Sequence, residues 1–330
     1  MSQPTLDVVA IGNAIVDVIA RSDDAFLASQ ALVKGGMQLI DAETATSLYA
    51  EMGTAIEMSG GSAANTLAGI AALGGACGFI GQVASDTLGT VFTHDIRALG
   101  ITFDTPARSD PPTARCLVLV TPDAQRTMNT FLGASQYLPA AAIDTALIAS
   151  ARILYLEGYL WDPEEPRAAM RAAIAAARDA GRMVAFTLSD TFVIDRHRDD
   201  FNALIDAGQI DILFSNENEI QALAQVDGFD AAVAAIAPKV KLLVSTRSEK
   251  GAIAIVDGQQ TAVPAAPVNE VIDTTGAGDL FAAGFLAAYV EGKEVENCLK
   301  LGALAAAEVI SHYGARPEAD LKALRVEAGL

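Results

Sequence analysis

The sequence predicts an α/β protein with a mostly parallel sheet, helices on both of its faces, and a small β-sheet lid. Two observations favour this class. Continuous apolar strand segments alternate with helical segments along most of the 330 residues, and hydrophobic residues make up 52% of the chain against 19% charged. Strands that are apolar throughout are typical of a parallel sheet that is covered on both faces.

The expected elements follow one another in a regular order. A continuous apolar strand covers 6–11, helical spacing marks 62–73, a strand follows at 77–83, and an amphipathic helix starting at Asp86 covers 86–99. The later segments alternate in the same way and read ILYLEG, AAMRAAIAAARDAG, MVAFTLS, DILFSN, EIQALAQV and VKLLVST. The run 58–85 has no ionisable group and is long enough to span a bilayer. Its seven glycines favour a strand, helix and strand of a soluble core instead.

Two stretches, at about 13–41 and 101–132, break this rhythm because they contain short alternating strands without long helices between them. Within the second, TARCLVLVTPDAQRTMNTFL predicts a hairpin that turns at Pro122–Asp123. No low-complexity linker and no internal repeat is present. We therefore interpret both stretches as insertions that form a lid on a single domain covering 1–330.

Charge and cysteine content restrict the partners and the compartment. A net charge of −19 argues against a nucleic-acid or anionic-membrane partner, either of which favours a basic surface. The cysteines Cys77, Cys116 and Cys298 show neither metal-ligand spacing nor a disulfide framework, and the N-terminal MSQPTLDVVAIG lacks the basic start of a secretion signal. The sequence predicts a cytoplasmic protein with small-molecule partners, and it leaves monomer and homodimer open.

The stretch VIDTTGAGDLFAAGF changes character at its centre. Val271–Ile272 are expected to end a strand, and the apolar run from Leu280 is expected to form a buried helix. Gly276, Ala277 and Gly278 would then lie at the amino end of that helix, where the first N–H groups have no partner within the helix. Glycines allow an anion to approach these amides closely, so the segment predicts a phosphate-binding site.

Asp279 is unexpected in such a site, because its carboxylate would compete with the bound anion. The conflict disappears if Asp279 faces a substrate hydroxyl as general base while the amides hold the transferring phosphoryl group. The alternative is that Asp279 only caps the helix. Asp273, Thr274 and Thr275 already offer capping groups before the first turn.

DTTGAGDLFAAGF closely resembles the C-terminal signature of the ribokinase-like (phosphofructokinase-B type) carbohydrate and nucleoside kinases, and the chain is similar to this family nearly end to end. The resemblance implies a ribokinase-like three-layer fold and ATP-dependent phosphorylation of an alcohol group with Mg²⁺. It implies that Asp279 is the base and that the amides of Gly276, Ala277 and Gly278 form the anion hole. Thr275 and Gly278 are expected beside the ATP.

Two further segments resemble the acceptor side of the family. IGNAIVD places Asn13 and Asp17 just after the first strand, without the G-x-G-x-x-G of a dinucleotide site. The resemblance implies that Asp17 holds a pair of sugar hydroxyls, for which a bidentate acceptor is suited. SGGSAANTLAGIAALGG resembles the other family signature, which implies that Gly60, Gly61 and Asn65 contact the substrate. From the residues alone, Asp17 could be a solvated lid residue and the glycines a tight turn.

The cation and nucleotide segments follow. FSNENEIQAL matches the N-x-x-E element of the family with Asn216 and Glu219, oxygen donors that suit Mg²⁺ held through water. VSTRSEKGAI resembles the nucleotide loop T-x-G-x-x-G. Thr246 and Gly251 fit this pattern, whereas Ser248 stands where a glycine is common.

The phosphate charge needs cations, because no Walker A sequence is present. Arg126 is the lid cation expected to reach the phosphates when the lid closes, and Lys250 is the second candidate. ALAAAEVISHYGARP resembles the adenine-side helix and loop of the family, which places Gly314 beside the nucleotide. His312 receives no catalytic role.

Within the family, KGGMQLID, RTMNTFLGAS, YLEGYLWD and TLSDTF look most like the adenosine-kinase branch. A purine needs apolar and aromatic surfaces, which Phe131, Tyr159 and Phe192 supply together with Met37 and Leu39. The alternative is that these side chains only fill the seam between lid and core. The predicted reaction is phosphorylation of the 5′-hydroxyl of adenosine by ATP, giving AMP and ADP. Another nucleoside or a free sugar of the ribose or fructose type is the second hypothesis, and a catalytically silent nucleoside-binding protein the third.

Overall fold

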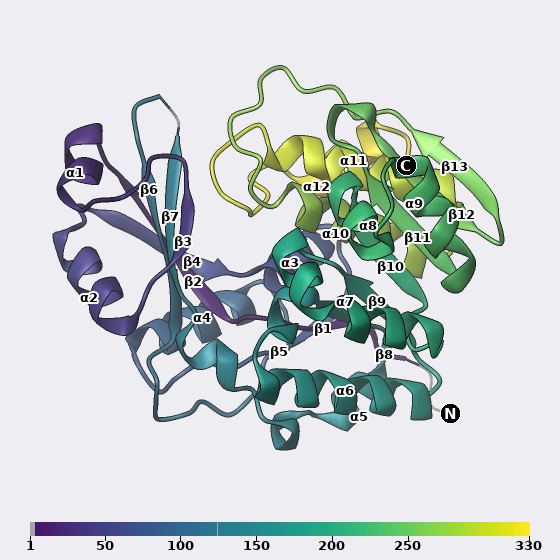
Figure 1. The fold of residues 1–330 in the computed structure, drawn as a ribbon, viewed down its shortest axis with the longest axis horizontal. Helices are drawn as coiled ribbons and strands as arrows, with labels where there is room; N and C mark the ends of the chain where they lie inside the picture. The colour runs from purple at the N-terminus through teal and green to yellow at the C-terminus, as the bar shows by residue number, and fades with distance from the viewer. Residues whose placement is uncertain (1–3, 124) are drawn as a thin grey trace.

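The computed structural model describes residues 4–123 and 125–330 and contains two sheets (Figure 1). The main sheet has eight strands in the order β13-β12-β11-β10-β9-β8-β1-β5. Its parallel strands are β1 (Leu6–Ile11), β5 (Cys77–Ile80), β8 (Ala151–Glu157), β9 (Met183–Thr187), β10 (Ile212–Asn216) and β11 (Leu242–Thr246). The antiparallel strands β12 (Ala252–Val256) and β13 (Gln259–Val263) complete one edge. The predicted fold class is confirmed, although β5 ends three residues earlier than predicted.

Side chains of the central strands alternate between two apolar clusters, one on each face of the main sheet. In β1, Val8 and Ala10 belong to one cluster, and Val9 and Ile11 belong to the other. The first cluster includes side chains of α3 (Ser62–Ala72), α4 (Thr87–Ala98), α10 (Ala277–Val290), α11 (Val295–Val309) and α12 (Leu321–Glu327). The second includes side chains of α5 (Thr145–Ser150), α6 (Glu164–Asp179), α7 (Thr191–Asp206), α8 (Glu217–Ala224) and α9 (Phe229–Ile236). The short 3₁₀ segments are η1 (Gly133–Tyr137), η2 (Ala140–Ala142), η3 (Gly158–Trp161), η4 (Ala237–Lys239) and η5 (Ser248–Lys250).

The lid is a separate five-stranded sheet in the order β3-β7-β6-β2-β4, with α1 (Asp24–Ser29) and α2 (Ala42–Glu51) on its outer side (Figure 1). Its strands are β2 (Ile15–Arg21), β3 (Met37–Leu39), β4 (Ala55–Gly60), β6 (Ala114–Val120) and β7 (Arg126–Phe131). β6 and β7 form the predicted hairpin around Pro122–Asp123. The lid also contains β4, which lies outside both predicted stretches because AIEMSG carries little apolar alternation. Residues 101–113 contribute only isolated bridges, one from Thr102 to Gly78 of the edge strand β5 and one from Arg108 to Ala84.

Two of the connections between the lid and the main domain lie beside each other. β1 continues through 12–14 into β2, and β4 continues through Gly60 and Gly61 into α3. Gly61 has φ +95°, and a Cβ at this position would stand 2.2 Å from the carbonyl oxygen of Asn13. Only glycine permits this close crossing of the two connections. The carboxyl end of β1, the amino end of α3 and the base of the lid therefore meet at one place.

Within the described residues no single helix has the length and apolar character to cross a membrane, and the bent pair Glu217–Ala224 and Phe229–Lys239 meets that test by length and composition alone.

Candidate active site

The amino end of α10 is open. The helix begins at Ala277, and Gly276 precedes it with φ +77° and without a side chain that caps the first turn. Gly278 is exposed, and a Cβ built on it would meet no atom within 4 Å. Ala277 N donates to the Thr274 carbonyl at 3.2 Å, whereas the N–H groups of Gly276 and Gly278 have no hydrogen-bond partner among the described residues, as an anion site requires.

Asp279 does not cap α10. Its carboxylate is directed at α3 instead, where Oδ1 accepts a hydrogen bond from Ser62 Oγ at 2.6 Å and Oδ2 accepts one from Asn65 Nδ2 at 3.1 Å. The interpretation of Asp279 as a simple cap is wrong. The carboxylate lies beside the open amides but is held by the acceptor-side helix.

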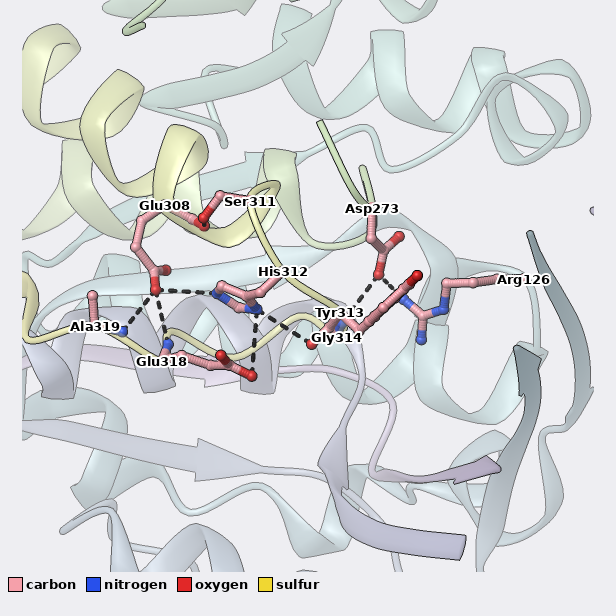
Figure 2. Close-up of polar contacts among 9 residues, drawn as sticks. All are labelled: Arg126, Asp273, Glu308, Ser311, His312, Tyr313, Gly314, Glu318 and Ala319. Atoms are coloured by element: carbon pink, nitrogen blue, oxygen red, sulfur yellow. Dashed lines mark hydrogen bonds and ion pairs between the residues drawn. The ribbon is translucent and has the colours of Figure 1, made fainter. Parts of the chain in front are cut away.

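Val271–Ile272 do not end a strand, so that prediction is wrong. Ile272 instead donates its N–H to the carbonyl of Ile310, and the following loop is organised by Asp273. Asp273 Oδ1 accepts from Thr275 N at 3.0 Å, and Oδ2 accepts from Gly314 N at 3.0 Å and from Arg126 (Figure 2). Thr275 and Gly314 are therefore held at the anion site by one buried carboxylate.

Burial raises the pKa of Asp279. The hydrogen bonds from Ser62 and Asn65, and the positive charge of Arg316, act in the opposite direction. A carboxylate with a raised pKa is a stronger base than an exposed aspartate, as general-base catalysis requires. Neither Ser62 nor Arg316 was predicted. Ser62 follows the glycine pair directly and Arg316 is the only cation of the tail loop 311–320, which are the signals that could have found them.

The structure brings three predicted acceptor residues next to Asp279. Asp17, on β2, packs against Gly60, where a Cβ would stand 2.3 Å from Asp17 Oδ2. Burial raises the pKa of Asp17 to about 6, and Arg316 and Arg126 oppose this rise while Asp279 adds to it. Asn65 Oδ1 is buried and has no hydrogen-bond partner. A buried acceptor without a donor fits a site that is completed by a hydroxyl of a bound substrate.

Asn13 is engaged inside the protein. Its backbone N and its Nδ2 both donate to Glu157 Oε1 at 2.7 Å, and Ala63 N donates to Glu157 Oε2 at 2.8 Å. Glu157 is fully buried, and burial raises its pKa to about 7. This carboxylate, which was not assigned a role from the sequence, ties the exit of β1 to the first turn of α3. Asn13 thus holds the crossing in place, and one hydrogen of its amide remains for a substrate.

Arg126 links the lid to the anion-hole loop. It lies at the start of β7, forms a buried ion pair with Asp273, and its Nε has no hydrogen-bond partner (Figure 2). The predicted lid cation is therefore already beside Thr275 and the end of α10. Lys250, by contrast, pairs with Glu217 at 3.1 Å on the nucleotide-loop side.

Asn216 and Glu219 form a capping box at the start of α8. Asn216 N donates to Glu219 Oε2 at 2.9 Å, and Asn216 Nδ2 donates to Oε1 at 2.6 Å. Burial raises the pKa of Glu219 to about 7. One carboxylate and one amide leave most positions of an octahedral Mg²⁺ to water and phosphate oxygens. The donor set therefore fits a cation held through water, and does not fit an all-protein metal cage.

The nucleotide loop lies next to this cation element. Thr246 and Asn216 are paired neighbours at the ends of β11 and β10. Ser248 has φ +50°, so it adopts the left-handed conformation that a glycine would adopt without strain. Gly251 has φ +89° and contacts the Val263 carbonyl so closely that a Cβ would stand 2.0 Å from its oxygen. The loop therefore keeps its backbone path despite the serine.

The predicted aromatic surface is divided between two parts of the protein. Tyr159 and Phe192 are half-buried neighbours with ring centroids 6.0 Å apart, and they follow the carboxyl ends of β8 and β9. Burial raises the pKa of Tyr159, and the charges of Asp190 and Asp279 add to the rise, which places this ring near the base. Phe131 is buried in the lid strand β7, and in the described chain no ring contact joins it to that pair.

His312 takes no part in this arrangement. Its Nε2 is 3.1 Å from Glu308 and its Nδ1 is 3.8 Å from Glu318, on the far side of Gly314 from Asp273 (Figure 2). Glu308 Oε1 also accepts the N–H groups of Glu318 and Ala319 at 2.9 and 2.8 Å. The cluster therefore shapes the loop 311–320, whose Gly314 then meets Asp273.

The sequence profile of the pfkB family carbohydrate kinases matches residues 6–321. The chain is 46% identical to the adenosine kinase from Sinorhizobium meliloti, with a TM-score of 0.90 over 98% of this chain and 99% of that chain. It is 45% identical to a probable sugar kinase from Rhizobium etli CFN 42, with a TM-score of 0.91 over 99% of both chains. The adenosine kinase of Dictyostelium discoideum is 27% identical over 254 residues, which cover 72% of this chain and 73% of that protein.

The match to this family defines a phosphotransferase that acts on an alcohol group, and the open end of α10 is compatible with this class. The chain belongs to the pfkB family of carbohydrate kinases, whose members use ATP with Mg²⁺.

Two glycine substitutions separate the packing role from the anion role of this turn. In Gly276→Ala the new Cβ would stand 2.7 Å from Ala315 Cβ at φ +77°, so we expect a loss of about 1–3 kcal/mol in the free energy of unfolding. Gly278→Ala meets no atom and should keep or raise stability, by up to about 1 kcal/mol. Its methyl group nevertheless stands where an anion approaches, so turnover with ATP should fall.

Chemical denaturation and steady-state kinetics measure both effects. Gly53→Ala is the matched control, because Gly53 is an exposed lid glycine whose added Cβ also meets nothing within 4 Å. Full turnover in Gly278→Ala would contradict the anion-hole assignment.

Proposed function

We propose that this chain phosphorylates the 5′-hydroxyl of adenosine with ATP, giving AMP and ADP. The observation that carries the proposal is the position of Asp279. Its carboxylate stands beside the open amides of α10 while Ser62 and Asn65 hold it from the acceptor-side helix. A hydroxyl placed here meets a base and an anion site together, which is the arrangement that phosphoryl transfer requires.

The acceptor is held by groups around the place where the two connections between the sheets cross. Asp17 accepts two ribose hydroxyls, and the backbone at Gly60 and Gly61 lets the sugar approach the chain closely. Asn65 Oδ1, which lacks a partner, accepts a further hydroxyl. Asn13 offers its remaining amide hydrogen. These contacts direct the primary hydroxyl towards Asp279.

The transfer itself uses the loop and the lid. Asp279 accepts the 5′-hydroxyl proton as that oxygen attacks the terminal phosphorus of ATP. The amides of Gly276, Ala277 and Gly278 hold the transferring group, and Arg126 exchanges its contact with Asp273 for the phosphate oxygens. Thr246, Gly251, Thr275 and Gly314 border the nucleotide. Mg²⁺, held through water by Asn216 and Glu219, neutralises phosphate charge when bound.

Two features support adenosine as the acceptor. The chain is 46% identical over nearly its whole length to an adenosine kinase. In addition, Tyr159 and Phe192 form an aromatic surface near Asp279, and Phe131 offers an apolar surface on the lid, as a purine ring requires. A free sugar is the second candidate, because the similarly related protein from Rhizobium etli is a probable sugar kinase.

An acceptor screen tests the proposal. Purified protein with Mg-ATP is offered adenosine, inosine, guanosine, ribose and fructose, and ADP release is followed by a coupled assay. We expect the highest kcat/KM with adenosine. A preference for ribose or fructose would show that the acceptor is that sugar and not adenosine. Adenosine binding in a thermal-shift assay without ADP release would indicate a catalytically silent binding protein.

Removing the base tests the chemistry. Asp279→Asn keeps the size and both hydrogen-bonding neighbours but cannot accept a proton, so kcat should fall by at least roughly 10²–10⁴-fold. Circular dichroism should show an unchanged fold. Asp257→Asn, in the exposed turn between β12 and β13, is the control and should keep wild-type kcat. Near-normal turnover in Asp279→Asn would remove this residue from the mechanism.

Asp17→Ala tests the acceptor contacts. We expect a raised KM for the acceptor with a smaller change in kcat, because Asp17 binds hydroxyls that do not react. Since its pKa is about 6, wild-type KM should also rise as the pH falls through 6 and Asp17 becomes protonated and loses acceptor capacity. The variant should lack this pH dependence. An unchanged KM in Asp17→Ala would contradict the role.

A further inference from the structure

Arg316 makes an unusual set of contacts for an arginine beside an active site. Its Nε and Nη2 donate to the carbonyl of Ser59 at 3.1 and 2.6 Å, Nη2 also donates to Ser59 Oγ at 2.9 Å, and Nη1 donates to the carbonyl of Ala64 at 2.9 Å. Ser59 lies 257 positions earlier in the chain. No carboxylate of the described residues forms an ion pair with this guanidinium at 4.0 Å or less. Its charge is therefore held in place by backbone carbonyls and a hydroxyl.

These contacts enclose the acceptor-binding turn. Ser59 and Ala64 stand on either side of Gly60, Gly61 and Ser62, and Asn65 follows directly. Asp95 of α4 accepts both the N–H and the hydroxyl of Ser59, and its negative charge raises the pKa of Arg316 against the effect of burial. The turn that supplies Ser62 and Asn65 to the base is thus fixed between Arg316 and Asp95.

The loop that carries Arg316 also contacts the anion hole. Gly314 donates its N–H to Asp273 at 3.0 Å, and the absent side chain of Gly276 leaves room for Ala315. Within three consecutive residues, the loop therefore contacts the phosphate side through Gly314 and Ala315, and the acceptor side through Arg316. The planar guanidinium of arginine holds several N–H donors in a fixed fork, which is suited to fix such a junction. The single ammonium group of a lysine is not.

The charge of Arg316 acts on the two carboxylates of the transfer site. Burial lowers the pKa of Arg316 to about 10, so it remains protonated at neutral pH. Its positive charge lowers the pKa of Asp17 and Asp279 against the effect of burial. The other ionisable groups that face these carboxylates from the packed elements are Glu157 of β8, Arg126 of β7, Cys116 of β6, Tyr155 of β8 and Tyr159 of η3. Arg126 is already paired with Asp273, so Arg316 is the cation whose charge is not neutralised by a direct partner.

We infer that Arg316 is a positioning residue for phosphoryl transfer, which locks the acceptor turn 59–65 to the anion-hole loop and places a positive charge beside the carboxylates of Asp17 and Asp279. The inference rests on the proposed function, because it assigns Arg316 to the same reaction. It goes beyond that function by naming a residue that touches neither substrate nor phosphate. Loss of the positive charge of Arg316 and loss of its guanidinium fork have separate consequences, so two variants distinguish them.

Arg316→Gln removes the charge and most of the fork. We expect the pKa of Asp279 to rise by about one unit, measured by carboxyl ¹³C NMR in which the Asp279 signal is assigned by its absence in Asp279→Asn. Because the base must be deprotonated, the acidic limb of the pH profile of kcat/KM should move to higher pH by the same amount. Misplacement of the turn should lower kcat/KM at the pH optimum by about 10²-fold.

Arg316→Lys keeps the charge without the fork. The pKa of Asp279 and the acidic limb should return to their wild-type positions, while kcat/KM at the optimum stays low and the acceptor KM stays raised. Arg178→Gln is the matched control. Arg178 also donates to a backbone carbonyl, that of Gly208, and pairs with the buried Asp211 at the start of β10, the end of the main sheet opposite to the site. This control should lose stability but keep the wild-type pH profile.

An unchanged pKa of Asp279 in Arg316→Gln overturns the inference, and so does a shift in Arg316→Lys as large as that in Arg316→Gln. If Arg316→Gln does not fold, Arg316→Lys decides alone: a wild-type pKa with a raised acceptor KM supports the inference, and a wild-type KM overturns it. The NMR titration needs no turnover. It therefore tests Arg316 even if the acceptor screen finds no phosphorylation, and failure of the proposed function is recognised separately.

Discussion

The free N–H groups at the amino end of α10 impose the constraint on which the rest of the site depends. In the proposed reaction they must remain open to an anion, yet a carboxylate must stand close enough to take a proton from the attacking hydroxyl. The structure satisfies both conditions by directing Asp279 away from its own helix and towards Ser62 and Asn65 of α3. Asp279 is therefore part of the proposed phosphate-binding segment in the sequence, whereas its side chain makes its hydrogen bonds to the acceptor-side helix α3.

The crossing of the two sheets makes this arrangement possible. Gly61 lets the chain leave β4 directly above the exit of β1, and Glu157 fastens both connections through Asn13 and Ala63. The proposed acceptor residues thus come from the base of the lid and from α3, while the proposed phosphate residues come from a loop of the main domain. The contacts of Asp279 with α3 lie within the main domain.

Most of the fold could be predicted because apolar alternation and glycine-rich turns are local signals. Strand β1, helix α3 and helix α4 with its Asp86 cap were found in this way. The lid strand β4 was missed because its pairing with β2, and not its composition, makes it a strand. Residues Val271–Ile272 show the reverse error, because a β-branched pair occupies an extended segment whose only backbone partner there is Ile310.

The same difference between local sequence signals and long-range contacts applies to the site. Motif spacing placed Asp279, Asn65 and Glu219 in the first turns of helices, Asn216 at the end of a strand, and Asp17 in the lid just after the first strand, as the structure has them. It could not show that Glu157 and Arg316 hold the junction, because their partners lie 94 to 257 positions away. Such contacts are decided by tertiary packing, which leaves no local pattern. The grouping of Phe131 with Tyr159 and Phe192 likewise depends on the position of the lid, and the sequence contains no information on that distance.

The remaining question is how a chain with net charge −19 accepts a triphosphate. Its cations near the cleft are already engaged: Arg126 with Asp273, Arg247 and Lys250 with Glu217, and Arg316 with carbonyls. Three of these four face a carboxylate that a phosphate would have to replace, and the fourth is fixed on the acceptor side. In the proposed function, the positive potential that requires no exchange of an existing ion pair therefore comes from the α10 amides and from Mg²⁺. Helix dipoles and a metal ion neither change their protonation nor move with the lid. In the proposed reaction, Asp279 is therefore the group near the transferring phosphoryl whose charge changes.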